Sequence, residues 1–122
     1  MVRGIRGATT VENNDAVEIR EATKELLSAI LTENDLKTED IASALFTVTP
    51  DLNASFPAAS AREIGWALVP LICSTEIPVP GGLSNCIRIM IHANTDRAQA
   101  DIRHIFLRRA TVLRPDLVKG SE

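Results

Sequence analysis

Apolar residues recur at helical spacing between positions 19 and 30. Asp15 stands three positions before Glu18, a pairing that is typical of a helix start. The apolar positions, which fall on one side of a helix, are Ile19, Ala22, Leu26 and Ile30. The polar positions, which fall on the opposite side, are Glu18, Glu21, Glu25, Ser28 and Thr32. The pattern predicts an amphipathic helix of about five turns laid on a sheet.

Other stretches are rich in β-branched residues and predict strands. They are residues 2–10, 41–49, 68–74, 87–93 and 104–113. The start of the second stretch, 41–46, also fits a continued helix, and the third is apolar enough to predict a buried strand. In the fourth, isoleucines alternate with Arg88, so we expect Arg88 on the face opposite the isoleucines.

Turn and helix signals connect these strands. Residues 34–40 are polar and turn-like, and Pro57 and Gly65 bracket a short helix over residues 58–65. Residues 96–102 predict a turn or a short helix. The resulting order predicts an α+β fold, a mixed sheet of about five strands with one long and one short helix on one face. If the other face is apolar, it would need cover from another subunit.

Length and composition limit the function classes. The chain has 122 residues, which suits one domain over 1–117 followed by a loose tail over 118–122. The net charge of −3 and the scarcity of aromatic residues argue against nucleic acid as a partner. No apolar run is long enough for a bilayer, and the start lacks a secretory pattern. We therefore expect a cytoplasmic protein with reduced cysteines, Cys73 and Cys86.

The usual catalytic motifs are absent from the sequence. His92 and His104 are the candidate bases at neutral pH, and surface or sheet packing is the simpler interpretation of both. Gly81-Gly82 predicts a turn rather than a phosphate loop, and no cluster of carboxylates and histidines predicts a metal site. Ten arginines stand against three lysines, a bias that favours anionic ligands. Arg6 and Arg88 lie in apolar strands, where a structural salt bridge and ligand binding are equally open.

Several segments, taken together and in order, resemble one known family. They are residues 2–12, 49–58, 62–63, 69–76, 81–88 and 112–117. This set is similar to the small, trimeric, mixed-sheet chorismate mutases, and the resemblance covers nearly the whole chain. It implies a homotrimer that forms a pseudo-α/β-barrel, with active sites between neighbouring subunits. It also implies that the protein rearranges chorismate to prephenate without a cofactor, a metal or a nucleophile.

The resemblance implies a role for each matching residue. Arg88 would stabilise negative charge on the breaking ether oxygen, Arg6 would anchor a substrate carboxylate, and Glu76 would accept the ring hydroxyl. Residues that would assist or line the site are Arg62, Arg114, Cys73, Phe56, Ala58 and Leu113. Phe106 stands where relatives carry a tyrosine, so one hydrogen bond to a carboxylate would be missing, a loss of about 1 kcal/mol.

Two other functions fit parts of this pattern. A non-catalytic trimer that binds small carboxylates would use the same arginines, and the missing tyrosine hydroxyl is compatible with it. An imine-processing hydrolase of similar trimeric shape is a third candidate, although no motif in the chain supports it.

Overall fold

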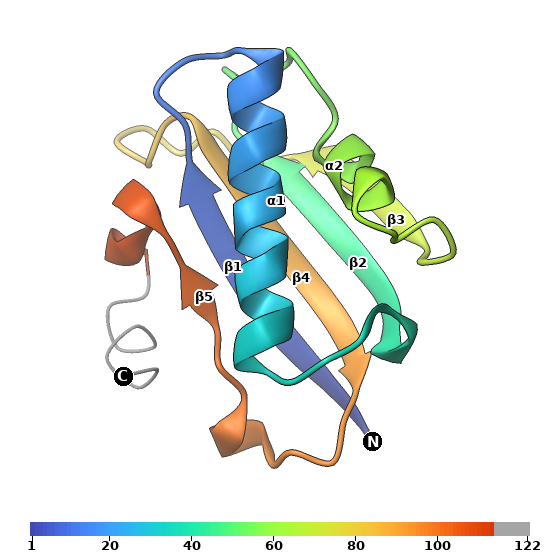
Figure 1. Ribbon diagram of the computed structural model, residues 1–122. Helices are drawn as coiled ribbons and strands as arrows, with labels where there is room; N and C mark the ends of the chain where they lie inside the picture. The colour runs from blue at the N-terminus through green and yellow to red at the C-terminus, as the bar shows by residue number, and fades with distance from the viewer. Residues whose placement is uncertain (114–122) are drawn as a thin grey trace.

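The computed structural model describes residues 1–113 as a five-stranded sheet with two α-helices on one face (Figure 1). The strands lie in the order β3-β2-β4-β1-β5. Their bounds are β1 Val2–Thr10, β2 Ile41–Val48, β3 Leu71–Thr75, β4 Cys86–Asn94 and β5 Ile105–Phe106. The helices are α1 Ala16–Glu33 and α2 Pro57–Glu63, with short 3-10 turns at Thr38–Asp40, Gln99–Asp101 and Arg108–Val112. The expected α+β fold is confirmed. In this part of the chain, no helix has the length and apolar character needed to cross a membrane.

Helix α1 forms where the periodicity predicted it. The Asp15 carboxylate accepts the Glu18 N–H at 3.0 Å and caps the first turn. Glu18 Oε1 accepts the Asn13 N–H at 3.2 Å, whereas the usual capping box would bond the N–H of Asp15, two residues later. At the other end, Asn34 closes the helix and is itself buried. The predicted apolar side is buried against the sheet, as Ile19, Ala22, Leu26 and Ile30.

The sheet is mixed, with β4 at its centre. β4 pairs antiparallel with β1 and β2, while β2–β3 and β1–β5 are parallel pairs. On the face beneath α1 and α2, Ile5 lies opposite Ile91 and Phe46 lies opposite Ile89. These side chains pack with the helices into the main core, which also encloses Trp66. The core therefore fills one side of the sheet.

Because side chains alternate along each strand, a second set lies on the other face of the sheet, which we call the open face. Arg6 lies opposite Met90, and Thr47 lies opposite Arg88. Because neighbouring residues of a strand point to opposite faces, Arg88 stands away from the isoleucines, as predicted. Both helices lie on the far side of the sheet from this surface (Figure 1).

Two strand predictions are wrong in extent. The strand expected over residues 104–113 pairs with β1 only at Ile105 and Phe106, and Arg108 then turns the chain with a φ of 53°. The buried strand expected over residues 68–74 begins only at Leu71 and lies at the sheet edge. Leu68 lies in the turn before the strand and is 97% exposed, and Ile72 is 64% exposed because the helices cover only one face of that edge.

The remaining elements agree with the sequence-based predictions. The first, second and fourth predicted strands form as β1, β2 and β4, so the helical alternative for residues 41–46 is excluded. The short helix begins with Pro57 in its first turn and ends before Gly65, which has a positive φ of 99°. The turns at residues 34–40 and 96–102 also form, each with one 3-10 turn.

We predict that Gly7→Ala destabilises the fold. A Cβ at Gly7 would lie 2.7 Å from Ile30 Cδ1 and 3.2 Å from Leu26 Cδ1, so these buried side chains of α1 would have to shift within a packed core. Overpacking of this kind costs about 1–3 kcal/mol. Chemical denaturation at a fixed protein concentration measures the loss. Gly4→Ala is the matched control, because its Cβ would meet only Met90 Sδ at 3.5 Å. Equal stability of the two variants would contradict the packing described.

Candidate active site

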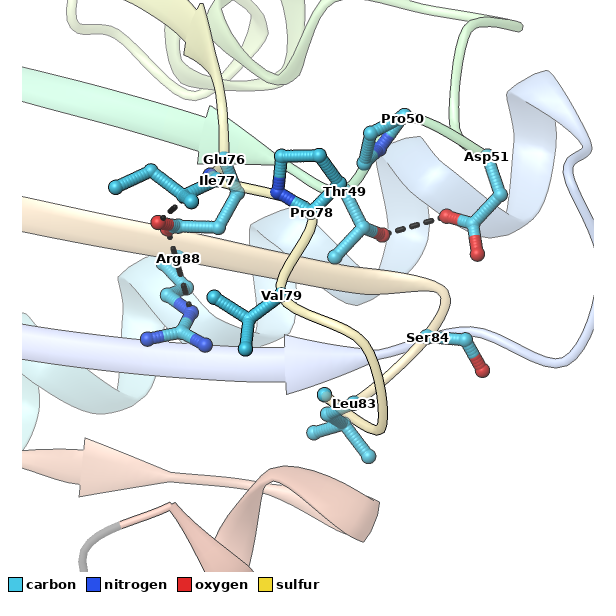
Figure 2. Close-up of a pocket in the computed structure, with 11 residues that line it drawn as sticks. Thr49, Pro50, Asp51, Glu76, Ile77, Pro78, Val79, Leu83, Ser84 and Arg88 are labelled. Atoms are coloured by element: carbon cyan, nitrogen blue, oxygen red, sulfur yellow. Dashed lines mark hydrogen bonds and ion pairs between the residues drawn. The ribbon is translucent and has the colours of Figure 1, made fainter.

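An ion pair between Arg88 and Glu76 lies on the open face. Arg88 Nε is 3.4 Å from Glu76 Oε2, and both side chains are about one-third exposed or less. The contact is electrostatic rather than a hydrogen bond, because the buried Nε–H has no acceptor in bonding geometry among residues 1–113. The carboxylate nevertheless lies where it can hold one side of the guanidinium. Figure 2 shows the pair in the wall of a recess.

The Glu76 carboxylate is fixed by its neighbours. Its Oε2 accepts the Thr47 hydroxyl at 2.8 Å, and its Oε1 accepts the Ile77 N–H at 3.3 Å. The Glu76 backbone N–H donates to Val48 O at 2.8 Å, which extends the β2–β3 pairing by one residue. These contacts orient the carboxylate toward Arg88 at the point where β3 ends.

Arg6 stands on the same face, one strand away from Arg88. Since Arg88 lies opposite Ala8, Arg6 is its diagonal neighbour across the β1–β4 pair. The Arg6 guanidinium lies 5.9 Å from the centre of the Phe106 ring, within the range of a cation–π contact. Arg6 forms no ion pair with another residue of the described part of the chain. Its charge is therefore available to an anion.

Two recesses meet at the Arg88–Glu76 pair. The first has a volume of about 380 Å³ and lies between the start of β4 and the loop that follows Glu76 (Figure 2). Its other lining residues are Thr49, Pro50, Asp51, Ile77, Pro78, Val79, Gly82, Leu83 and Ser84. The second, of about 180 Å³, is lined by Arg6, Leu45, Thr47, Glu76, Arg88, Ile89 and Met90. Arg6, Glu76 and Arg88 thus converge on one place, which suits a small molecule with negative charge.

The other residues expected at the site lie elsewhere in the chain. Phe56, Ala58 and Arg62 belong to α2 or its N-terminal boundary, on the helix-covered side of the sheet. Phe56 is 71% exposed and Arg62 is exposed, whereas Ala58 is buried in the main core. The Cys73 side chain also packs on the helix side, since Cys73 lies opposite Phe46. One chain therefore carries the expected residues on two opposite surfaces.

Of the site residues expected near the C-terminus, Phe106 and Leu113 lie on the open face, and Arg114 lies beyond the described residues 1–113. Leu113 packs against a small cluster on the open face that contains Ala8, Cys86, Phe106 and Ala110. Phe106 is buried there beneath Arg6. Arg114 and the predicted tail over residues 118–122 lie outside the described residues.

Cys86 is the titratable group beside this site whose pKa is clearly perturbed. Burial raises the pKa of the Cys86 thiol, and the nearby charge of Arg88 opposes this shift without overcoming it. A raised pKa means less thiolate at any given pH, and the thiolate is the reactive form. Cys86 is therefore an inert apolar residue behind Arg88 rather than a nucleophile.

Thr47 is a residue of this site that sequence analysis did not identify. It reaches Glu76 because β2 lies between β3 and β4, so that Thr47 is opposite both Ser74 and Arg88. The only local signal for Thr47 was its hydroxyl group, and threonines are common in strands. The contact depends on strand order and register, neither of which is encoded within the strand itself.

Comparisons with known proteins identify the family. The family model for chorismate mutase type I matches residues 2–117. The chain is 52% identical over 118 residues to chorismate mutase AroH of Bacillus subtilis (strain 168), covering 96% of this chain and 93% of that protein. It is 50% identical over 118 residues to chorismate mutase AroH of Thermus thermophilus, covering 96% and 97% respectively. A chorismate mutase structure from Clostridium thermocellum has a TM-score of 0.89 and 50% identity, covering 90% of this chain and 98% of that one.

The fold and these matches define an isomerase of the α+β class. The chain belongs to the type I chorismate mutase family. The expected activity, which belongs to aromatic amino acid biosynthesis, is confirmed by these relatives.

We predict that Cys86 resists thiol reagents in the native protein. It is fully buried, so a reagent cannot reach the thiol, and its pKa is raised, so less of the reactive thiolate forms. A Cys86→Ala variant should therefore show the same number of labelled thiols as the wild type in native buffer at mildly alkaline pH. After unfolding it should show one fewer. A difference already present in native buffer would contradict the burial of Cys86.

Proposed function

We propose that this chorismate mutase acts at sites formed between neighbouring subunits of a cytoplasmic homotrimer, and that Arg88, Arg6 and Glu76 are its catalytic residues. The observation that carries the proposal is the convergence of these three side chains on one recess of the open face. The folded domain would extend to residue 117, the last residue that the family model matches.

The reaction determines what the site must do. One C–O bond breaks as one C–C bond forms, within a single molecule folded into a compact chair. No proton transfer or covalent intermediate is required, so catalysis depends on holding the chair and stabilising charge as it develops. Positive groups at fixed positions meet both needs.

Arg88 is placed to act on the developing charge. The ether oxygen becomes more negative in the transition state, so a cation beside it stabilises that state more than the bound substrate. Because Glu76 pairs with Nε of Arg88, the two terminal nitrogens of the guanidinium are left for the substrate. Thr47 keeps the Glu76 carboxylate in place. The same carboxylate would accept the ring hydroxyl of chorismate.

Arg6 is placed to hold a substrate carboxylate. Its guanidinium has no acidic partner among the described residues and rests over the Phe106 ring. A planar guanidinium grips a carboxylate with two parallel hydrogen bonds, which fixes position as well as charge. This role concerns binding, which is shared by ground state and transition state.

The separation of the expected residues supports a site shared by two subunits. In a cyclic trimer, one surface of each subunit contacts a different surface of the next. The open face would supply Arg6, Glu76, Arg88, Phe106 and Leu113. The neighbouring subunit would supply Phe56, Ala58, Arg62 and Cys73 from the region of α2 and β3, and Arg114 would act near the mouth of the cleft. Leu45 and Ile72, apolar residues exposed on the open face, would be covered by the same contact.

We expect different kinetic effects from the two arginines. Arg88→Ala should lower kcat by about 10²–10³-fold, as loss of a transition-state hydrogen-bond donor does. Arg6→Ala should chiefly raise KM, since it removes binding common to both states. The measurement is the loss of chorismate absorbance with purified protein. Arg97→Ala is the matched control, because Arg97 lies beyond the far end of β4 and bonds the carbonyl of Glu33.

Two outcomes would contradict this proposal. A wild-type protein that binds prephenate tightly without turning over chorismate would instead be a non-catalytic carboxylate-binding trimer. Equal and modest losses in both arginine variants would show that neither has the role assigned here.

Phe106→Tyr should improve substrate binding. The ring already lies beneath Arg6 in a buried position, and a tyrosine there would add a hydroxyl donor beside the carboxylate anchor. One such bond is worth about 1 kcal/mol, or about a fivefold lower KM with little change in kcat. Phe106→Leu keeps an apolar residue without the ring and should raise KM. An unchanged KM in both variants would place Phe106 outside the binding site.

A further inference from the structure

The Arg6 backbone has a bonding partner that the strand pattern does not predict. The Arg6 N–H donates to Nδ1 of His104 at 2.9 Å, a contact between residues far apart in the chain. It lies where β1 and β5 begin to pair. His104 directly precedes β5, so its side chain is held next to the strand edge.

This bond completes the β1–β5 pairing with a side chain. Gly7 and Ala8 lie opposite Ile105 and Phe106, and the Leu107 N–H donates to Ala8 O at 2.9 Å. In a strand, the N–H groups of alternate residues point to the same edge, so the N–H of Arg6 points toward β5, as that of Ala8 does. In a longer β5, the carbonyl of residue 103 would accept the Arg6 N–H. The imidazole of His104 accepts it instead.

Asn34 explains why the backbone carbonyl of Arg103 does not accept the Arg6 N–H. Its side-chain amide donates to Arg103 O at 2.9 Å and accepts the Arg103 N–H at 2.8 Å. The same amide also donates to Ile30 O at 2.9 Å, and the residue is 2% exposed. The end of α1 therefore holds Arg103 and removes its carbonyl from the ladder.

We propose that His104 is a positioning residue for Arg6. Its Nδ1 fixes the β1 backbone from one side, while Phe106, two residues later, supports the guanidinium on the open face. β4 holds β1 along its whole length, so an unanchored Arg6 N–H would let the short β5 shift against β1. The Phe106 ring would move with β5, and the Arg6 guanidinium would lose its support. The proposal rests on the proposed function, in which Arg6 anchors the substrate.

Three substitutions separate this role from simple packing. The Oδ1 of asparagine lies as many bonds from Cβ as the histidine Nδ1, so His104→Asn keeps an acceptor but loses volume. His104→Leu keeps a branched side chain of similar reach but has no acceptor. His104→Gln carries its oxygen one bond farther out, where it no longer meets the Arg6 N–H. A packing role would favour leucine over asparagine, and the positioning role favours the reverse.

The test is full steady-state kinetics of the three variants with chorismate. His104→Leu and His104→Gln should raise KM about tenfold with kcat within about twofold, because misplacement of a binding group weakens its grip. His104→Asn should stay within about twofold of the wild-type KM. If the leucine variant does not fold, the glutamine and asparagine pair decides the question. A wild-type KM in His104→Gln, or an equal rise in His104→Asn, would overturn the proposal.

Arg6→Ala separates failure of this inference from failure of the proposed site. In an Arg6→Ala background, His104→Gln should add no further increase in KM, since the two act through one contact. If Arg6→Ala itself leaves KM unchanged, the proposed anchoring role of Arg6 is wrong. If Arg6→Ala raises KM but His104→Gln does not, only the role of His104 is wrong.

Discussion

The two helices cover only one face of the sheet, and this constraint shapes the rest of the molecule. α1 and α2 pack on the isoleucine face of β4 and complete a core there. The opposite face carries Arg6, Thr47 and Arg88 beside apolar residues such as Leu45. Charges that would be costly inside a closed core are thereby kept at a surface, where they can meet a ligand.

The charged residues of the open face are held in place by neighbouring side chains. Glu76 holds Arg88, Thr47 holds Glu76, and Phe106 supports Arg6. Groups that are already in place cost little reorganisation when charge develops on a substrate. Chorismate mutase chemistry needs this more than it needs acids or bases, because the substrate rearranges within itself. A rigid sheet is a suitable support for such a site.

The elements that were predictable from sequence depend on local periodicity. The α1 pattern from Ile19 to Ile30 and the alternation around Arg88 each lie within a single element, and both predictions are confirmed. β5 does not extend back past Ile105 because Asn34 holds Arg103, and it ends early because the chain turns at Arg108; no local pattern contains these features. The bond from Thr47 to Glu76 likewise depends on strand register. The resemblance to a family identified residues such as Phe56 and Arg62, which lie far from Arg88 within one chain and join it only in the proposed site between subunits.

Trimers assembled from two inactive chains test the shared site most directly. One chain would carry Arg88→Ala and the other Phe56→Ala with Arg62→Glu, and both would be co-expressed with different affinity tags. In a cyclic trimer that contains both chains, one site in about three pairs an intact open face with an intact α2 surface. Purified mixed trimers should therefore recover up to about a third of wild-type activity. Activity no greater than that of the separate variants, or full activity of the α2 variant alone, would contradict a site built from two subunits.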